Sequence, residues 1–131
     1  GNVIDLFSVD AVKPAIVAER MHTDLARVFK SGEWREVSVT MKTRVLSQAV
    51  MGILQMHGQG VVHGDVKAAN FLATEDLSVV KVTDLGLAGV IGSPVNGGSL
   101  GSICPENSFI YRGSGSGDDS CPLTPAGDVY G

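Results

Sequence analysis

The 131-residue chain lacks the features that would assign it to several specialised classes. Its two cysteines are too few for a disulfide framework or a zinc site, and they leave the redox compartment open. No apolar run reaches the roughly 18 residues of a membrane span. The first residues lack the basic-then-apolar pattern of a signal peptide. A formal net charge of −4 without a basic patch argues against a nucleic-acid partner.

The residues that are abundant indicate a globular chain of the size of one domain. Hydrophobic residues make up 44% and charged residues 18% of the sequence, which is typical of a chain that folds around a core. Because aromatic residues account for only 5%, aliphatic side chains and methionine must build that core. Most of the 17 glycines follow residue 85, so we expect the last third to be rich in loops.

Local patterns in the first third predict two strands and a short helix. Residues 2–9 and 12–19 are rich in Val and Ile, which favours strands. Residues 22–30 are typical of a helix that begins at Thr23 or Asp24, since both side chains can cap a helix.

The strongest periodic signal predicts a long helix over residues 37–58. Ser38 can cap its start, while Gly58 and Gly60 can end it. His57 is expected at the surface or the helix end. Residues at helical spacing predict one buried face, consisting of Met41, Val45, Leu46, Ala49, Val50, Ile53, Leu54 and His57.

Two short apolar runs further along the chain each end in polar residues and glycine. Val61-Val62 precedes HGDVKAAN (residues 63–70), and residues 79–82 precede TDLGL (residues 83–87). Strand ends of this kind deliver polar side chains into loops on a rigid base. We therefore expect a functional site at these two loops.

The two loops carry the groups that phosphoryl transfer needs. A carboxylate can orient an acceptor hydroxyl, Mg²⁺ prefers carboxylate and amide oxygens, and a cation stabilises the moving phosphoryl group. Asp65, Lys67, Asn70 and Asp84 supply these four roles. Gly86 gives the second loop room to turn and to bring Asp84 close to a metal.

The order HGDVKAAN, then DLG, resembles the catalytic loop H-R-D-L-x-x-x-N and the metal loop D-F-G of protein kinases. The resemblance implies ATP and Mg²⁺ as cofactors and a protein as substrate. It implies that Asp65 is the catalytic base, that Asn70 and Asp84 hold Mg²⁺, and that Lys67 acts beside the nucleotide. His63 and Leu85 match the residues whose packing links the two loops, and Gly86 matches the glycine of the metal loop.

The resemblance extends in both directions. Downstream, Pro105 and Glu106 lie where the family has A-P-E, and Ser99 matches the hydroxyl residue of the activation segment. Asp128 resembles the residue that holds the catalytic-loop backbone from the start of the central helix. Upstream, the resemblance implies an adenine-binding hinge with three contacts to the nucleotide: Glu19, Met21 and Asp24.

The implied fold class is α+β, and the chain is expected to be an internal piece of a kinase-like domain. Residues 1–21 correspond to the last strands and the hinge of the N-lobe, and residues 22–131 to the mainly helical C-lobe up to the central helix. The glycine-rich loop, strand Lys and helix Glu of the family have no counterpart here. We therefore expect the 131-residue chain to be inactive alone, either as a true fragment or as a truncated gene product.

Lys67 and Ser99 favour serine/threonine specificity, and the style of the catalytic loop resembles rhoptry kinases of apicomplexan parasites. A rhoptry-type protein would be secreted. Gly64 stands where the family has Arg, so switching by an activation-segment phosphate is expected to be weak. Two alternatives stay open. One is a pseudokinase that acts as an interaction module, and the other is a small-molecule phosphotransferase like the aminoglycoside or choline kinases.

Overall fold

The structure, a computed structural model, describes residues 1–10, 12, 15–94 and 122–130. The chain forms two compact units, Gly1–Gly52 with Ala68–Thr83, and Ile53–Lys67 with Asp84–Gly131. Helix α3 (Val39–Gly58) contributes residues to both. Within the described part of the chain, no helix has the length and apolar character needed to cross a bilayer.

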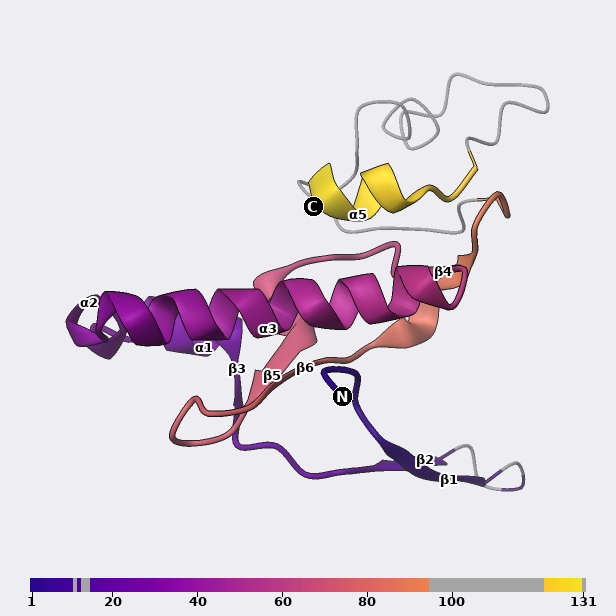
Figure 1. Ribbon diagram of the computed structural model, residues 1–131. Coiled ribbons are helices and arrows are strands. Elements are labelled where there is room, and N and C mark those ends of the chain that lie inside the picture. The colour runs from indigo at the N-terminus through magenta and orange to yellow at the C-terminus, as the bar shows by residue number, and fades with distance from the viewer. Residues whose placement is uncertain (11, 13–14, 95–121, 131) are drawn as a thin grey trace, which may run out of the picture. The chain divides into compact units, whose positions relative to one another are not determined.

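The first unit begins with an antiparallel strand pair, β1 (Leu6–Asp10) and β2 (Ala15–Ala18), which Figure 1 shows as a hairpin. The sequence predicted two strands here, but β1 begins later than expected. Residues 3 and 4 instead join a different strand, because Val3 bridges Val82 and the Ile4 amide donates to the Val82 carbonyl at 2.9 Å. The Val and Ile pattern thus indicates extended backbone without identifying its partner.

A second, three-stranded antiparallel sheet consists of β3 (Thr23–Asp24), β5 (Phe71–Ala73) and β6 (Val80–Val82), in that order. The helix predicted over residues 22–30 is present as the shorter α1 (Leu25–Lys30). It begins later than predicted because Thr23 and Asp24 belong to β3. Asp24 caps α1 by accepting a hydrogen bond from the Arg27 amide at 3.0 Å. Of the two predicted caps, Asp24 is therefore the one used.

A tight turn follows β5 and is built around Asp76. The hydroxyls of Thr74 and Ser78 donate to its carboxylate, each at 2.7 Å, and the Ser78 amide donates at 3.0 Å. These bonds stabilise the charged form and lower the pKa of Asp76 from 3.8 to about 2. The turn thereby returns the chain into β6.

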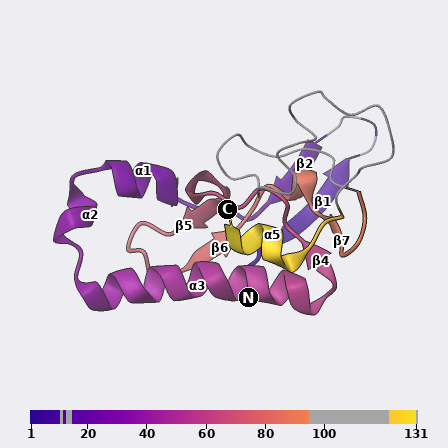
Figure 2. The ribbon, with the colours of Figure 1, turned by 90° about the horizontal axis from the view of Figure 1, so that it is seen from above.

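The chain turns back through a short helix, α2 (Glu33–Glu36), which the sequence did not predict, before it enters α3 (Figure 2). The prediction of a long helix is confirmed, with α3 spanning Val39–Gly58. The Ser38 hydroxyl accepts from the Met41 amide at 3.2 Å, as expected of a cap. Gly60 takes φ +74°, which glycine adopts without penalty just beyond the helix end.

The predicted buried face of α3 is wrong in part. Val45 and Ile53 are buried, but three of the expected members have about half of their surface exposed, Leu46 at 50%, Val50 at 57% and Leu54 at 54%. Periodicity identifies residues that share a face, but the neighbouring elements decide how much of that face they cover.

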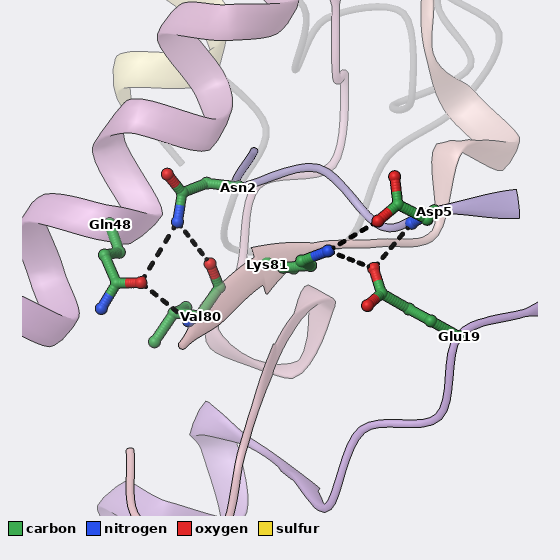
Figure 3. A network of polar contacts seen from close by, with 6 residues as sticks. All are labelled: Asn2, Asp5, Glu19, Gln48, Val80 and Lys81. Atoms are coloured by element: carbon green, nitrogen blue, oxygen red, sulfur yellow. Dashed lines mark hydrogen bonds and ion pairs between the residues drawn. The ribbon is translucent and has the colours of Figure 1, made fainter. Parts of the chain in front are cut away.

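Helix α3 packs tightly against the N-terminal segment and β6. Gln48 Oε1 accepts from the Val80 amide at 3.1 Å, and the Asn2 amide group donates to the Val80 carbonyl at 2.8 Å (Figure 3). A Cβ atom at Gly52 would lie 2.6 Å from the Asn2 carbonyl oxygen, so only glycine permits this approach. The hydrogen bonds of Gln48 and Asn2, together with the close approach that Gly52 permits, therefore fix the register of α3 against β6.

The second unit contains the antiparallel pair β4 (Val61–Val62) and β7 (Gly89–Val90), the 3-10 turn η2 (Leu85–Leu87) and helix α5 (Pro125–Tyr130). Its buried apolar residues include Val62 and Leu123. The Leu123 amide donates to the Ser93 carbonyl at 2.7 Å, and the Gly92 amide donates to the Leu123 carbonyl at 2.9 Å. These bonds join the segment before α5 to the segment after β7.

Candidate functional site

The loop that follows β4 carries a buried carboxylate beside a lysine. Asp65 is 6% exposed, and Lys67 Nζ donates to its Oδ2 atom at 2.6 Å. The Asp65 amide donates to Nδ1 of His63, which is itself fully buried. The loop thus holds an acidic and a basic group of the predicted site in direct contact.

Helix α5 supplies a second carboxylate, which binds the backbone of the same loop. The Asp128 carboxylate accepts from the His63 amide at 2.7 Å and from the Gly64 amide at 2.8 Å. Asp128 is 4% exposed, so these bonds satisfy a charge that would otherwise be costly to bury. The contact with the loop backbone is the one that the sequence resemblance implies for Asp128, while any role in catalysis stays a prediction.

His57 completes this arrangement and was missed as a partner by sequence reasoning. It lies at the end of α3 as expected, but it is not a surface residue, because its side chain is only 13% exposed. Its Nε2 atom lies 2.8 Å from Asp128 Oδ2. No sequence signal pairs two residues that are 71 positions apart, so only the fold identifies this contact.

Gly64, which stands where the family pattern has Arg, occupies a position that glycine suits. Its backbone takes φ +80°, and a Cβ atom there would lie 2.7 Å from the carbonyl oxygen of Leu87. Both the conformation and the lack of space disfavour a side chain. The replacement is therefore matched by the backbone geometry around it.

Asp84, the residue directly before η2, has an unusual backbone. It takes φ +60° and ψ 67°, the left-handed region that residues other than glycine rarely adopt. A Cβ atom on Gly86 would be 3.4 Å from Asp84 Oδ1, so the glycine leaves room for this carboxylate. Asp84 is exposed, and the backbone strain is of the kind that collects at functional sites. Leu85, next to it, is 38% exposed.

Asn70 and the predicted nucleotide contacts lie in the first unit. Asn70 is 4% exposed at the end of η1 (Ala68–Asn70), and its carbonyl accepts from the Thr83 amide at 2.8 Å. Glu19 Oε1 accepts from the Asp5 amide, while Asp24 uses its carboxylate to cap α1. Met21 is partly buried. The acidic side chains proposed to contact the nucleotide therefore also have structural partners within this unit.

A cavity of about 360 Å³ lies in the first unit beside α1 and α2. Its lining includes Thr23, Trp34 and Leu77. None of the predicted nucleotide contacts lines it, so it supplies no support for the nucleotide site.

Three predicted site residues, Ser99, Pro105 and Glu106, fall outside the described residues. Among the residues that the structure describes, no group of three or more His, Cys, Asp or Glu side chains could hold a metal ion. The metal pair proposed from the sequence uses one carboxylate and one amide, and these oxygen donors suit Mg²⁺ chemically.

Residues 2–110 match the model of the protein kinase domain. The chain belongs to the protein kinase family. This membership confirms the predicted α+β, kinase-like fold class. The match also supports the broad interpretation of the HGDVKAAN and DLG loops as parts of a kinase domain.

The chain is also similar in sequence to individual protein kinases, over stretches of different length. Mitogen-activated protein kinase 4 of Homo sapiens is 40% identical over 77 residues, which cover 58% of this chain and 12% of that protein. CBL-interacting protein kinase 26 of Oryza sativa subsp. japonica is 30% identical over 109 residues, covering 83% and 22%. The Raf homolog serine/threonine-protein kinase of Caenorhabditis elegans is 35% identical over 92 residues, covering 66% and 11%. The chain thus spans less than a quarter of the length of each of these kinases.

Proposed function

We propose that the protein to which this chain belongs transfers the γ-phosphoryl group of ATP to serine or threonine hydroxyls of protein substrates. The observation that carries the proposal is the pairing of the buried Asp65 carboxylate with the Lys67 ammonium at 2.6 Å. A carboxylate held in this way can accept a hydroxyl proton, and the neighbouring cation can offset the charge of a phosphoryl group.

In the proposed reaction, Asp65 takes the proton of the substrate hydroxyl while the oxygen bonds to the γ-phosphorus. The bond from that phosphorus to the bridging oxygen breaks, and ADP leaves with the electron pair. Lys67 lies beside the base and offsets charge on the transferred group. Bound Mg²⁺, held by Asn70 and Asp84, would neutralise charge on the phosphates. Family membership supports ATP and Mg²⁺, and the role of each residue is our proposal.

The remaining residues take supporting roles in the proposal. Asp128 and His63 orient the catalytic loop, and Gly86 leaves room for the Asp84 carboxylate. The nucleotide is contacted by Glu19, Met21 and Asp24. The domain is divided into the strands and hinge of the N-lobe (residues 1–21) and a segment of the C-lobe (residues 22–131). Ser99, Pro105 and Glu106 belong to the activation segment and its anchor.

Serine/threonine specificity rests on Lys67 and Ser99 and agrees with the name of the serine/threonine-protein kinase of Caenorhabditis elegans. The narrower likeness to rhoptry kinases, and the secretion it would imply, rests on the sequence pattern alone. Lys67 and the Cys104-Pro105-Glu106 segment argue against a small-molecule phosphotransferase, because those features serve protein substrates in the family.

The deciding experiment measures Mg²⁺- and ATP-dependent labelling of protein substrates by the full-length protein. We expect Asp84→Asn to abolish transfer, because the amide removes the charge that the metal needs. Asp76→Asn is the matched control, since Asp76 lies in a turn outside the proposed site and its variant should transfer normally.

Three results would contradict the proposal. Transfer retained by Asp84→Asn would remove the metal assignment. Label found on tyrosine, or on an aminoglycoside or choline in place of protein, would change the substrate class. Nucleotide binding without any transfer in the wild-type protein would favour the pseudokinase.

A further inference from the structure

Lys81, in the middle of β6, is a buried cation between two carboxylates. Its side chain is 10% exposed, and its Nζ atom lies 2.8 Å from Asp5 Oδ2 and 2.5 Å from Glu19 Oε1. Figure 3 shows the ammonium group between the two acids. Asp5 directly precedes β1, and Glu19 directly follows β2. The proposed reaction assigns no role to this lysine.

The two carboxylates differ in how far they are withdrawn from water. The side chain of Glu19 is 22% exposed and that of Asp5 is 66% exposed. Hydrogen bonding to Asp5, and secondarily to Glu19, raises the pKa of Lys81, so the lysine stays charged. The bond from Lys81 likewise lowers the pKa of Asp5. Exposed ion pairs contribute little to stability. The pair of Lys81 with the less exposed partner, Glu19, is therefore the one that mainly holds the two side chains in place.

Glu19 is held by its backbone as well as by its side chain. The Glu19 amide donates to the Asp5 carbonyl at 3.0 Å, and Glu19 Oε1 accepts from the Asp5 amide at 2.8 Å. Together with the bond from Lys81, three contacts fix the residue that directly follows β2. Residue 19 also begins the segment, 19–21, to which the proposed function assigns adenine binding.

β6 connects this contact to the other loop of the proposed site. The strand is fully buried and ends two residues before Asp84. Val82 accepts from the Ile4 amide and donates to the Asn2 carbonyl at 2.8 Å, so the segment leading into Asp5 is bonded to the same strand. Lys81 therefore ties the start of segment 19–21 to a strand whose position is already fixed by backbone hydrogen bonds.

We propose that Lys81 is a positioning residue for nucleotide binding, which acts by holding Glu19 and with it the segment 19–21. The inference rests on the proposed function, because it takes the adenine contacts from there. A positioning residue of this kind changes the affinity for ATP and leaves the chemical step unchanged, since it touches neither the phosphates nor the base Asp65.

The test compares three variants of the full-length protein in ATP-dependent transfer. Lys81→Met removes the charge at similar length, Lys81→Arg keeps it, and Asp5→Asn weakens only the exposed partner. We expect Lys81→Met to raise KM for ATP about tenfold with kcat unchanged, which is the lower end of the loss seen when a residue that orients a metal-binding side chain is removed. Lys81→Arg should restore most of the affinity, and Asp5→Asn should change KM by less than about twofold.

Glu19→Ala provides a second route if Lys81→Met does not fold, because Lys81 then keeps Asp5 as a partner. We expect it to raise KM as Lys81→Met does, and the double variant to show no further increase, since the two residues act as one unit. The inference would be overturned if Glu19→Ala left the KM for ATP unchanged. It would also be overturned if kcat fell by as large a factor as KM rose.

The failure of this inference can be told apart from the failure of the proposed function. Wild-type transfer combined with unchanged KM in the variants would overturn only the role of Lys81. Wild-type nucleotide binding without transfer would overturn only the proposed activity, and the same variants would then be compared by their Kd for ATP. A wild-type protein that binds no nucleotide would overturn both.

Discussion

Replacing Gly64 by alanine would place a methyl group close to a backbone oxygen. Gly64 takes φ +80°, and a Cβ atom there would lie 2.7 Å from the Leu87 carbonyl oxygen. Gly60 offers a matched control, because it takes nearly the same conformation, φ +74°, with no atom within 4 Å of its Cβ position. The two alanine variants therefore share the backbone strain, and only Gly64→Ala adds the collision.

The expected magnitudes follow from these two contributions. A left-handed alanine costs about 1–2 kcal/mol, which is the only cost expected in the folded state of Gly60→Ala. The collision at Gly64 adds about 1–3 kcal/mol, the usual cost of forcing extra volume into a packed site. Alanine also restricts the unfolded chain, but it does so equally in both variants, so that contribution cancels in the difference.

Equilibrium unfolding in urea of the wild-type protein and both variants measures this difference. We expect the free energy of unfolding to fall by about 1–3 kcal/mol more in Gly64→Ala than in Gly60→Ala. An equal loss in the two variants would refute the reasoning, since it would mean that Leu87 moves away without cost. A smaller loss at Gly64 than at Gly60 would refute the assigned backbone contact itself.

Two further predictions concern stability in the first unit. Gly52→Ala should lower the free energy of unfolding by about 1–3 kcal/mol relative to Gly58→Ala, because its Cβ would meet the Asn2 carbonyl whereas Gly58 has open space; equal urea midpoints would contradict this. The pKa of Asp76 is lowered to about 2, so its contribution to stability is complete above about pH 4 and is lost as the pH falls toward 2. A carboxyl titration followed by NMR should place its midpoint near 2, and a midpoint near 3.8 would contradict the hydrogen-bonded turn.

Features of the fold with local causes could be predicted from the sequence. Ser38 caps α3, Asp24 caps α1 and Gly60 takes a left-handed conformation, as the short-range rules require. The exposure of Leu46 and Val50 could not be predicted, because helical spacing defines a face without specifying what covers it. The later start of β1 has the same origin, since the preceding residues bond to β6.

The candidate site divides in the same way. The residue types Asp65 and Lys67 could be found from their spacing in one loop, and the structure adds their direct contact. The pairing of His57 with Asp128 could not be found, since it joins residues that are 71 positions apart. Lys81 reads as an ordinary strand residue, and only its two acidic neighbours in the fold distinguish it.

The contact between Asp128 and the loop at His63 and Gly64 also has a consequence for the order of events during synthesis. The acceptor carboxylate lies 65 positions after His63, so the ribosome completes it well after the loop has been made. At usual elongation rates this interval is roughly 3 to 13 s. During that time the two loop amides lack the acceptor that they have in the finished protein. We therefore expect the segment around residues 63–65 to reach its final geometry late in synthesis, only after Asp128 has left the ribosome and can accept the two hydrogen bonds.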